Sequence, residues 1–159
     1  MPNWCSITMR IVCPAVYDAE KFEKAIELEI QKADEKKQAT FLGSNSKYLF
    51  WPELERNKEE ISLHGDVRWA LDSCEMKEWI EWLLKIAPIS WLTAEYEEGG
   101  MCIYGKYYFG GKSLTDTWLP QEFYPKLTEE NSDFYYDLLE KALDKHGVDK
   151  FVAEFETAA

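Results

Sequence analysis

The sequence has few of the residues and segments by which metal-binding, redox and membrane proteins are commonly identified. It contains two histidines, His64 and His146, far apart in the chain, and its four cysteines form no C-x-x-C pair. No apolar run approaches the roughly 20 residues of a membrane-spanning helix, and no N-terminal stretch has the pattern of a signal peptide. We therefore expect a cytoplasmic protein with no metal, no other cofactor and no membrane segment.

Basic residues are also scarce relative to acidic ones. The chain has 18 Lys and Arg against 30 Asp and Glu, which gives a formal net charge of −12. Binding to a phosphate backbone requires clustered Lys and Arg, so direct binding of nucleic acid is not expected. A basic protein partner, including one that itself binds nucleic acid, suits this charge better, although solubility alone also explains it.

Apolar and aromatic residues are abundant enough for a well-packed core. The hydrophobic fraction is 46% and the aromatic fraction 15% over 159 residues, which excludes general disorder. There is no internal repeat, low-complexity segment or obvious linker. We expect one domain over residues 1–159, with a core over 1–112 and a C-terminal extension over 113–159.

Hydrophobic periodicity predicts the order of the elements. Alternation predicts strands over residues 4–13, 61–71 and 91–97, and a hairpin partner over 101–109 after the Gly99-Gly100 turn. Helical spacing predicts helices over residues 18–36, 72–87 and about 132–146. Residues 47–51, 112–118 and 151–155 are expected as further short strands, and 52–60 as a charged connection.

This order predicts an α+β fold. We expect a ferredoxin-like antiparallel sheet with two helices on one face, plus an extra hairpin strand and a C-terminal helix. The other sheet face must be polar or be covered, by the C-terminal helix or by a partner. Cys5 and Cys13 lie on the buried side of the first strand, and all four cysteines are interpreted as buried thiols.

Two blocks of sequence carry a resemblance to a known family. They are the opening Met1-Pro2-Asn3-Trp4-Cys5, and the run from Trp79-Ile80-Glu81-Trp82-Leu83 through Glu95-Tyr96-Glu97-Glu98-Gly99 to Tyr104-Gly105-Lys106. Together they resemble the YubB-type ferredoxin-like domain family, small proteins carried mostly by phages and plasmids. The resemblance covers roughly residues 1–112, departs from the family around residues 40–60, and implies a mobile-element origin in a bacterial host. It implies no catalytic activity.

Candidate catalytic groups are few. Cys74 or Cys102 could pair with His64 as a nucleophile, but nothing in the sequence around either cysteine indicates an activated thiol. Pro2, if Met1 is removed, could act as a base with Arg10 or Arg68 as substrate-holding groups. Both arrangements are less favoured than an ordinary structural role, so we expect no catalytic residues.

Acidic and aromatic side chains are the better candidates for function. Acidic residues cluster in several places, and such a surface could imitate a phosphate array and occupy the basic groove of a nucleic-acid-binding protein. These residues are Glu53, Glu55, Glu59, Glu60, Glu95, Glu97, Glu98, Glu129, Glu130, Asp133 and Asp137. Exposed aromatics could anchor a protein contact, and here the candidates are Trp82, Trp91, Tyr104 and Tyr108. Solvation and core packing explain the same residues without any function.

The resulting hypothesis is a non-enzymatic protein that binds a host or defence-system protein, as an inhibitor of a nucleic-acid-binding complex. Its predicted contact residues are Glu95, Glu97, Glu98, Trp82, Trp91 and Tyr104. Two alternatives stay open: a small enzyme that uses Pro2, His64 and Arg68, and a self-associating protein whose open sheet face forms a homodimer.

Overall fold

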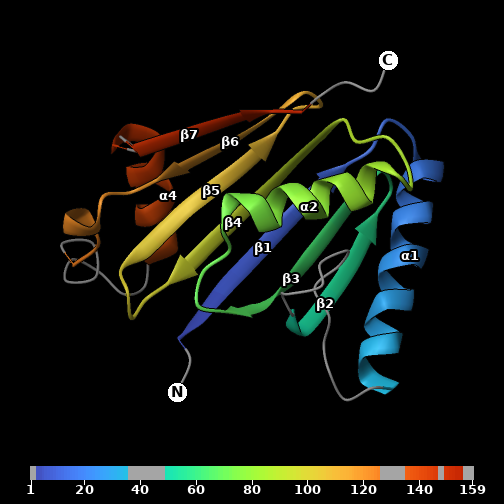
Figure 1. Ribbon diagram of the computed structural model, residues 1–159, viewed down its shortest axis with the longest axis horizontal. Helices are drawn as coiled ribbons and strands as arrows, with labels where there is room; N and C mark the ends of the chain where they lie inside the picture. Colours follow the sequence, from blue (N-terminus) through green and yellow to red (C-terminus); the bar gives the residue numbers. More distant parts are fainter. Residues whose placement is uncertain (1–2, 36–48, 126–134, 147–148, 156–159) are drawn as a thin grey trace.

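Seven antiparallel strands form one sheet that runs through the whole molecule. The computed structural model describes residues 3–35, 49–125, 135–146 and 149–155 (Figure 1). The strand order across the sheet is β2-β3-β1-β4-β5-β6-β7. In chain order the strands are β1 Trp4–Val12, β2 Phe50–Asn57, β3 Glu60–Arg68, β4 Trp91–Glu98, β5 Ile103–Phe109, β6 Ser113–Trp118 and β7 Asp149–Glu154.

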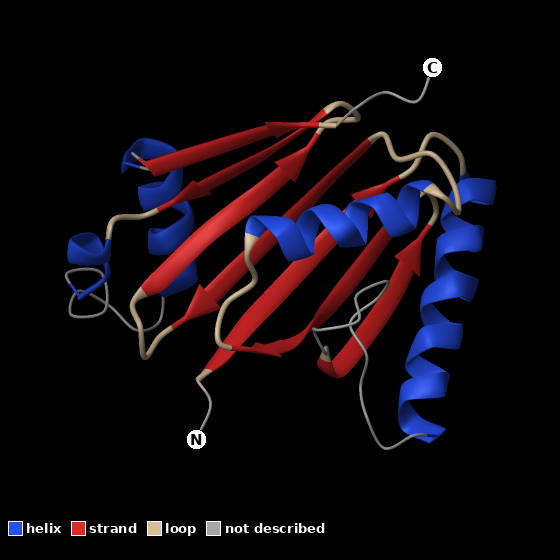
Figure 2. Cartoon of the chain, in the orientation of Figure 1, coloured by secondary structure: helices blue, strands red, loops and turns tan. Residues whose placement is uncertain are grey.

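Three α-helices lie around this sheet within the described part of the chain. They are α1 Val16–Glu35, α2 Ser73–Leu84 and α4 Tyr135–His146, with a short 3-10 helix at Gln121–Phe123. Figure 2 shows α2 running across the strands and α1 beside the β2 edge. None of the described helices is both long and apolar enough to cross a membrane.

The main core lies between one sheet face, here called the helix face, and helices α1 and α2. Alternate residues of β1 (Cys5, Ile7, Met9 and Ile11) are almost fully buried against Phe22 and Ile26 of α1 and Trp79 and Ile80 of α2. Helix α2 was predicted over residues 72–87, and its N-terminus is capped by Asp72, whose carboxylate accepts a 2.8 Å hydrogen bond from the Glu75 N–H. Helical periodicity and strand alternation therefore act together to build this core.

The opposite sheet face, here called the open face, is covered in part by α4 (Figure 1). A second, smaller core forms there from Tyr104 of β5 and Leu139, Ala142 and Leu143 of α4, with Leu119 and Tyr124 from the intervening segment. Over β1 and β3 the open face instead presents polar side chains: Ser6, Thr8, His64 and Asp66. The C-terminal helix thus covers the part of this face around Tyr104 and leaves the polar surface of β1 and β3 exposed.

The prediction of a two-helix ferredoxin-like sheet with one extra hairpin strand was wrong. The protein is α+β, but its sheet has seven strands, because β6 and β7 continue it beyond β5. The short strand expected over residues 112–118 corresponds to β6, which lies between β5 and β7. The C-terminal part therefore extends the same sheet and covers its other face.

Residues 52–57 differ from the prediction of a charged connection, because together with residues 50 and 51 of the predicted strand over 47–51 they belong to β2, Phe50–Asn57. This edge strand has a register shift against β3 between Phe50 and Glu53. Trp51 within this shift has a positive φ of 50°. A proline at position 52 and the charged residues after it are tolerated because this strand has a neighbour on one side only.

Candidate functional site

A groove lies on the open face, between the exposed surface of β1, β3 and β4 and the side of α4. Its volume is about 220 Å³. The lining residues are Ser6 and Thr8 of β1, His64 of β3, Glu95, Tyr96 and Glu97 of β4, Tyr104 of β5, and Tyr136, Asp137 and Glu140 of α4. Four of these ten residues are acidic and none is Lys or Arg. We call this the acidic groove.

Strand pairing places the polar floor of the acidic groove. Thr8 lies opposite His64 on β3 and opposite Glu95 on β4, so three functional side chains share one row of the open face. Thr8 Oγ1 lies 3.0 Å from His64 Nδ1. Two residues before Thr8 on β1, the Ser6 hydroxyl donates a hydrogen bond to the Asp66 carboxylate at 2.9 Å. These bonds orient the hydroxyl and imidazole groups on the floor.

The carboxylates of the groove produce a negative local field. Burial, and then the carboxylates of Glu95 and Glu140, raise the pKa of the Tyr104 phenol far above its ordinary value. Lys106 partly offsets this field, since its ammonium lies 3.7 Å from Glu95. Asp137 and Glu140 on α4 are exposed, so their charges face solvent at the mouth of the groove.

Glu97 holds the groove together rather than offering a free charge. Its carboxylate accepts hydrogen bonds from the Tyr124 hydroxyl at 2.6 Å and the Tyr135 hydroxyl at 2.8 Å. The two phenols also contact each other. Glu97 therefore ties β4 to the first turn of α4 and to the segment before it.

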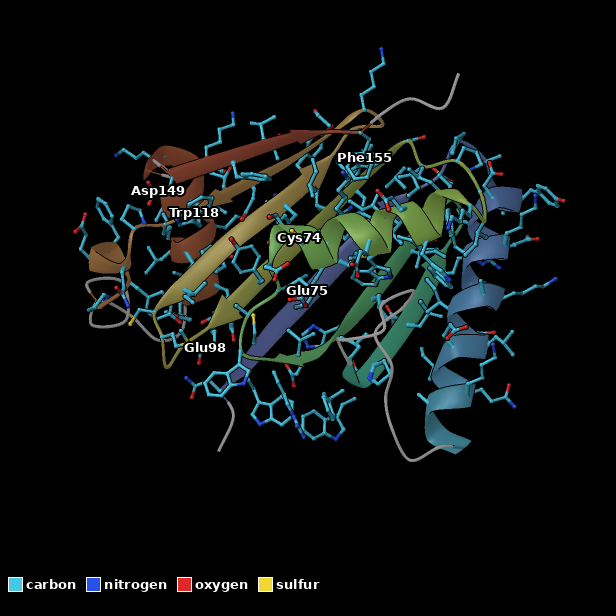
Figure 3. The ribbon with its side chains drawn as sticks, in the orientation of Figure 1. Cys74, Glu75, Glu98, Trp118, Asp149 and Phe155 are labelled. Atoms are coloured by element: carbon cyan, nitrogen blue, oxygen red, sulfur yellow. The ribbon has the colours of Figure 1, made fainter. Side chains whose placement is uncertain are left out.

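Glu98 was predicted on an exposed acidic surface, and that prediction was wrong. Its side chain is 2% exposed. The carboxylate accepts a hydrogen bond from the Gly100 N–H at 2.9 Å and another from the Met101 N–H. Figure 3 shows Glu98 at the tip of the β4–β5 hairpin, where it caps the turn. Strand alternation alone places it on the buried side, with Tyr96.

The predicted aromatic contacts are also divided between different parts of the molecule. Tyr104 is 4% exposed and belongs to the second core, so it is a wall of the groove rather than a protruding anchor. Trp82 on α2 packs against the main core on the helix face. Trp91 lies on the open face with the Arg10 guanidinium 5.4 Å from its ring. The six predicted contact residues therefore do not form one surface.

The exposed aromatic cluster that sequence reasoning missed lies at the start of β1. The Trp4 ring is 4.9 Å from Phe50 and 5.0 Å from Trp51, with the Arg68 guanidinium 5.1 Å from Phe50. Trp51 is 65% exposed and Trp69 53% exposed. The strand predicted over 61–71 includes Trp69, and its alternation would bury that side chain. β3 instead ends at Arg68, and Trp69 has a φ of 66°, which breaks the alternation.

Catalytic candidates are not brought together. Cys74 lies on the first turn of α2, on the helix face, while His64 is on the open face, and Cys102 lies in the β4–β5 turn near the Gly99 carbonyl. Arg10 pairs with Glu60 at 2.5 Å.

Four predicted candidates lie outside the described residues: Pro2, Glu129, Glu130 and Asp133. In the described part of the chain, no group of three or more His, Cys, Asp or Glu is arranged to hold a metal ion.

The cysteines divide into two kinds. Cys5 and Cys13 are buried as expected, and burial raises the pKa of the Cys13 thiol to about 11. Cys74 is exposed and Cys102 is only partly buried, contrary to the prediction that all four are buried. The helical stripe of α2 explains the exposure of Cys74, because Met76, Trp79, Ile80 and Leu83 turn inward and leave position 74 on the outer side.

No family model matches this chain, and neither a curated protein nor a solved structure is significantly similar to it. The resemblance to the YubB-type family therefore stays a prediction. The contacts and charges described above are the observations from which a function can be inferred.

Proposed function

We propose that this protein is a non-enzymatic binding protein whose acidic groove takes basic side chains from the surface of another protein. One observation carries the proposal. Four carboxylates line one groove whose lining residues include no Lys or Arg: those of Glu95, Asp137 and Glu140, and that of Glu97, which already accepts hydrogen bonds from two tyrosines. A guanidinium or ammonium group entering it would meet acceptors from β4 and α4 at once.

Two physical effects favour a basic partner. The net charge of −12 attracts a positively charged surface over long range and raises the association rate. Within the groove, the rings of Tyr104 and Tyr136 lie beside the carboxylates, so a cation could also contact an aromatic face. Tyr136 is 70% exposed and does not belong to the second core.

Proteins that bind nucleic acid present clustered Lys and Arg to phosphates. A protein that occupies those side chains with carboxylates would compete with nucleic acid for the same surface. Together with the resemblance to proteins of phages and plasmids, this favours an inhibitor of a nucleic-acid-binding defence protein in the cytoplasm of a bacterial host.

The test is a pull-down from bacterial lysate, treated with nuclease and eluted in a salt gradient. The wild-type chain should retain a nucleic-acid-binding protein after nuclease treatment and release it at moderate salt, because the contact is electrostatic. The double variant Asp137→Lys, Glu140→Lys should lose most of this binding, at least about tenfold in affinity for two reversed charges.

The matched control is Glu20→Lys, Glu27→Lys on α1. It makes the same change in net charge at two exposed helix positions far from the groove. Circular dichroism should show both variants folded. Equal loss of binding in the two variants would mean that only overall charge matters, and the assignment of the groove would then be rejected.

A further inference from the structure

Strand β7 ends the sheet, and no other described strand pairs with its outer edge. Its register with β6 is unbroken from Ser113↔Glu154 to Trp118↔Asp149. Figure 3 labels Asp149, the first residue of this strand, and Phe155, the residue that follows its end. The Phe155 N–H donates to the Lys112 carbonyl at 2.8 Å. Hydrogen-bonding groups alternate along a strand, so the backbone N–H and C=O groups of residues 149, 151 and 153 also point toward β6. The backbone N–H and C=O groups of residues 150, 152 and 154 therefore point outward.

The other edge of the sheet has features that prevent strand addition. Strand β2 contains Pro52, which has no N–H, and a register shift between Phe50 and Glu53. Helix α1 lies beside it, with Arg56 Nε 3.2 Å from a Glu23 carboxylate oxygen. The described part of β7 has no proline and no register shift, and it presents Phe151 and Val152 at 42% and 55% exposure.

We propose that β7 pairs antiparallel with β7 of a second copy of this chain, extending the sheet across a two-fold axis at Val152. Only outward-facing residues can exchange hydrogen bonds, so residues 150, 152 and 154 of one copy must face residues 150, 152 and 154 of the other. With Val152 opposite Val152, Lys150 lies opposite Glu154 on both sides of the axis. Each of these pairs exchanges two backbone hydrogen bonds.

Charge complementarity selects this register among those that the backbone allows. A shift of two residues in either direction would remove Lys150 from its position opposite Glu154. The symmetric register repeats the basic–acidic pair twice and also brings Phe151 of one copy opposite Ala153 of the other. Such an isologous contact closes at two copies and leaves no further free edge at β7.

The acidic groove is lined by β1, β3, β4, β5 and α4, so this contact does not use it. The two proposals can therefore fail separately. Binding of a basic partner tests the groove, and the oligomeric state tests the edge of β7.

The test is sedimentation equilibrium of the full chain up to about 100 μM, a range that reveals weak interfaces. The wild type should be a dimer in equilibrium with monomer. Lys150→Glu and Glu154→Lys should each raise the dissociation constant at least about tenfold, because like charges then face each other. The double swap Lys150→Glu, Glu154→Lys should bring the dissociation constant back to within about threefold of the wild-type value, since the acidic and basic residues again face each other with their positions exchanged.

Two further variants keep the result specific. Val152→Pro removes an outward N–H and no bond to β6, so it should give a folded monomer. Lys141→Glu and Glu122→Lys change the charge at exposed positions outside β7 and should leave the dimer unchanged. A monomer at every concentration, or a dimer that the β7 variants do not weaken, would overturn the proposal; the second result would place self-association on another surface.

Discussion

Asp116 is a carboxylate in an environment that disfavours its charged form. It lies on β6 facing the main core, 8% exposed, and accepts a 2.7 Å hydrogen bond from the Tyr96 hydroxyl. Burial raises the pKa of its carboxyl to about 6, although hydrogen bonds from Tyr96 and Tyr107 act to lower that pKa. Gly105 makes this arrangement possible, because a Cβ there would overlap the Tyr96 ring.

The raised pKa of Asp116 predicts a pH-dependent stability. Between pH of about 4 and 6, Asp116 keeps a proton in the folded protein that it has lost in the unfolded chain. The contribution of Asp116 to the free energy of unfolding therefore decreases as the pH rises through this range and is constant above it. Asp116→Asn keeps an acceptor without a charge. We expect it to be more stable than wild type at pH 7.5 by about 1–2 kcal/mol, with the difference shrinking at pH 4.5.

Urea denaturation at the two pH values measures this difference. Asp144→Asn, an exposed residue on α4, is the control for losing one carboxylate and should give a small, pH-insensitive change. If Asp116→Asn destabilises the protein equally at both pH values, the charged carboxylate is required in the core and the argument from burial fails.

Helix α4 is the element that turns an open sheet face into a groove. Its apolar residues Leu139, Ala142 and Leu143 cover Tyr104, while Asp137 and Glu140 on its free side supply half of the groove's carboxylates. Its first turn is fixed by the hydrogen bond from Tyr135 to Glu97. The position of the helix therefore depends on a β4 residue that also lines the groove.

Removing one hydroxyl should loosen this helix. Tyr135→Phe keeps the ring and removes the hydrogen bond to the Glu97 carboxylate, so we expect a loss of about 1–2 kcal/mol in the free energy of unfolding. Amide hydrogen exchange should become faster in α4 before it does in α2. Tyr136→Phe, whose side chain is 70% exposed, should change neither quantity. Unchanged exchange in both variants would show that apolar packing alone holds α4.

The whole molecule carries an excess of negative charge. With 30 acidic residues against 18 basic ones, this charge favours the proposed basic partner over a phosphate backbone. Several of the basic side chains are also engaged locally, as Arg10 is by Glu60 and Arg56 by Glu23. No described part of the chain supplies a cluster of free cations to the acidic groove.

The charge predicts that the protein does not bind nucleic acid directly. In an electrophoretic mobility assay at about 50 mM salt, where phosphate contacts are strongest, duplex DNA and single-stranded RNA should run unchanged with the wild-type chain. A basic protein known to shift the same probes serves as the positive control. A shift that disappears on raising the salt would reveal a cationic surface and contradict the proposed class of partner.

Local patterns determined most of the elements. Alternation identified β1, β3, β4, β5 and β7, helical spacing identified α1, α2 and α4, and the cap at Asp72 placed the start of α2. These features depend on neighbours within a few residues, so the sequence alone contains them. Only the first two residues of β2 fell within the predicted strand over 47–51. Residues 52–57 were missed because Pro52 and the charged residues after it resemble a connection unless their position at the sheet edge is known.

The strand order, and with it the site, was decided by tertiary structure. Pairing of β1 with both β3 and β4 brings Thr8, His64 and Glu95 into one row, although they are far apart in sequence. The docking of α4 then adds Asp137 and Glu140, and the same packing buries Tyr104. Charge and alternation predict that acidic residues exist on strands and helices; only long-range pairing and burial determine which of them face one another.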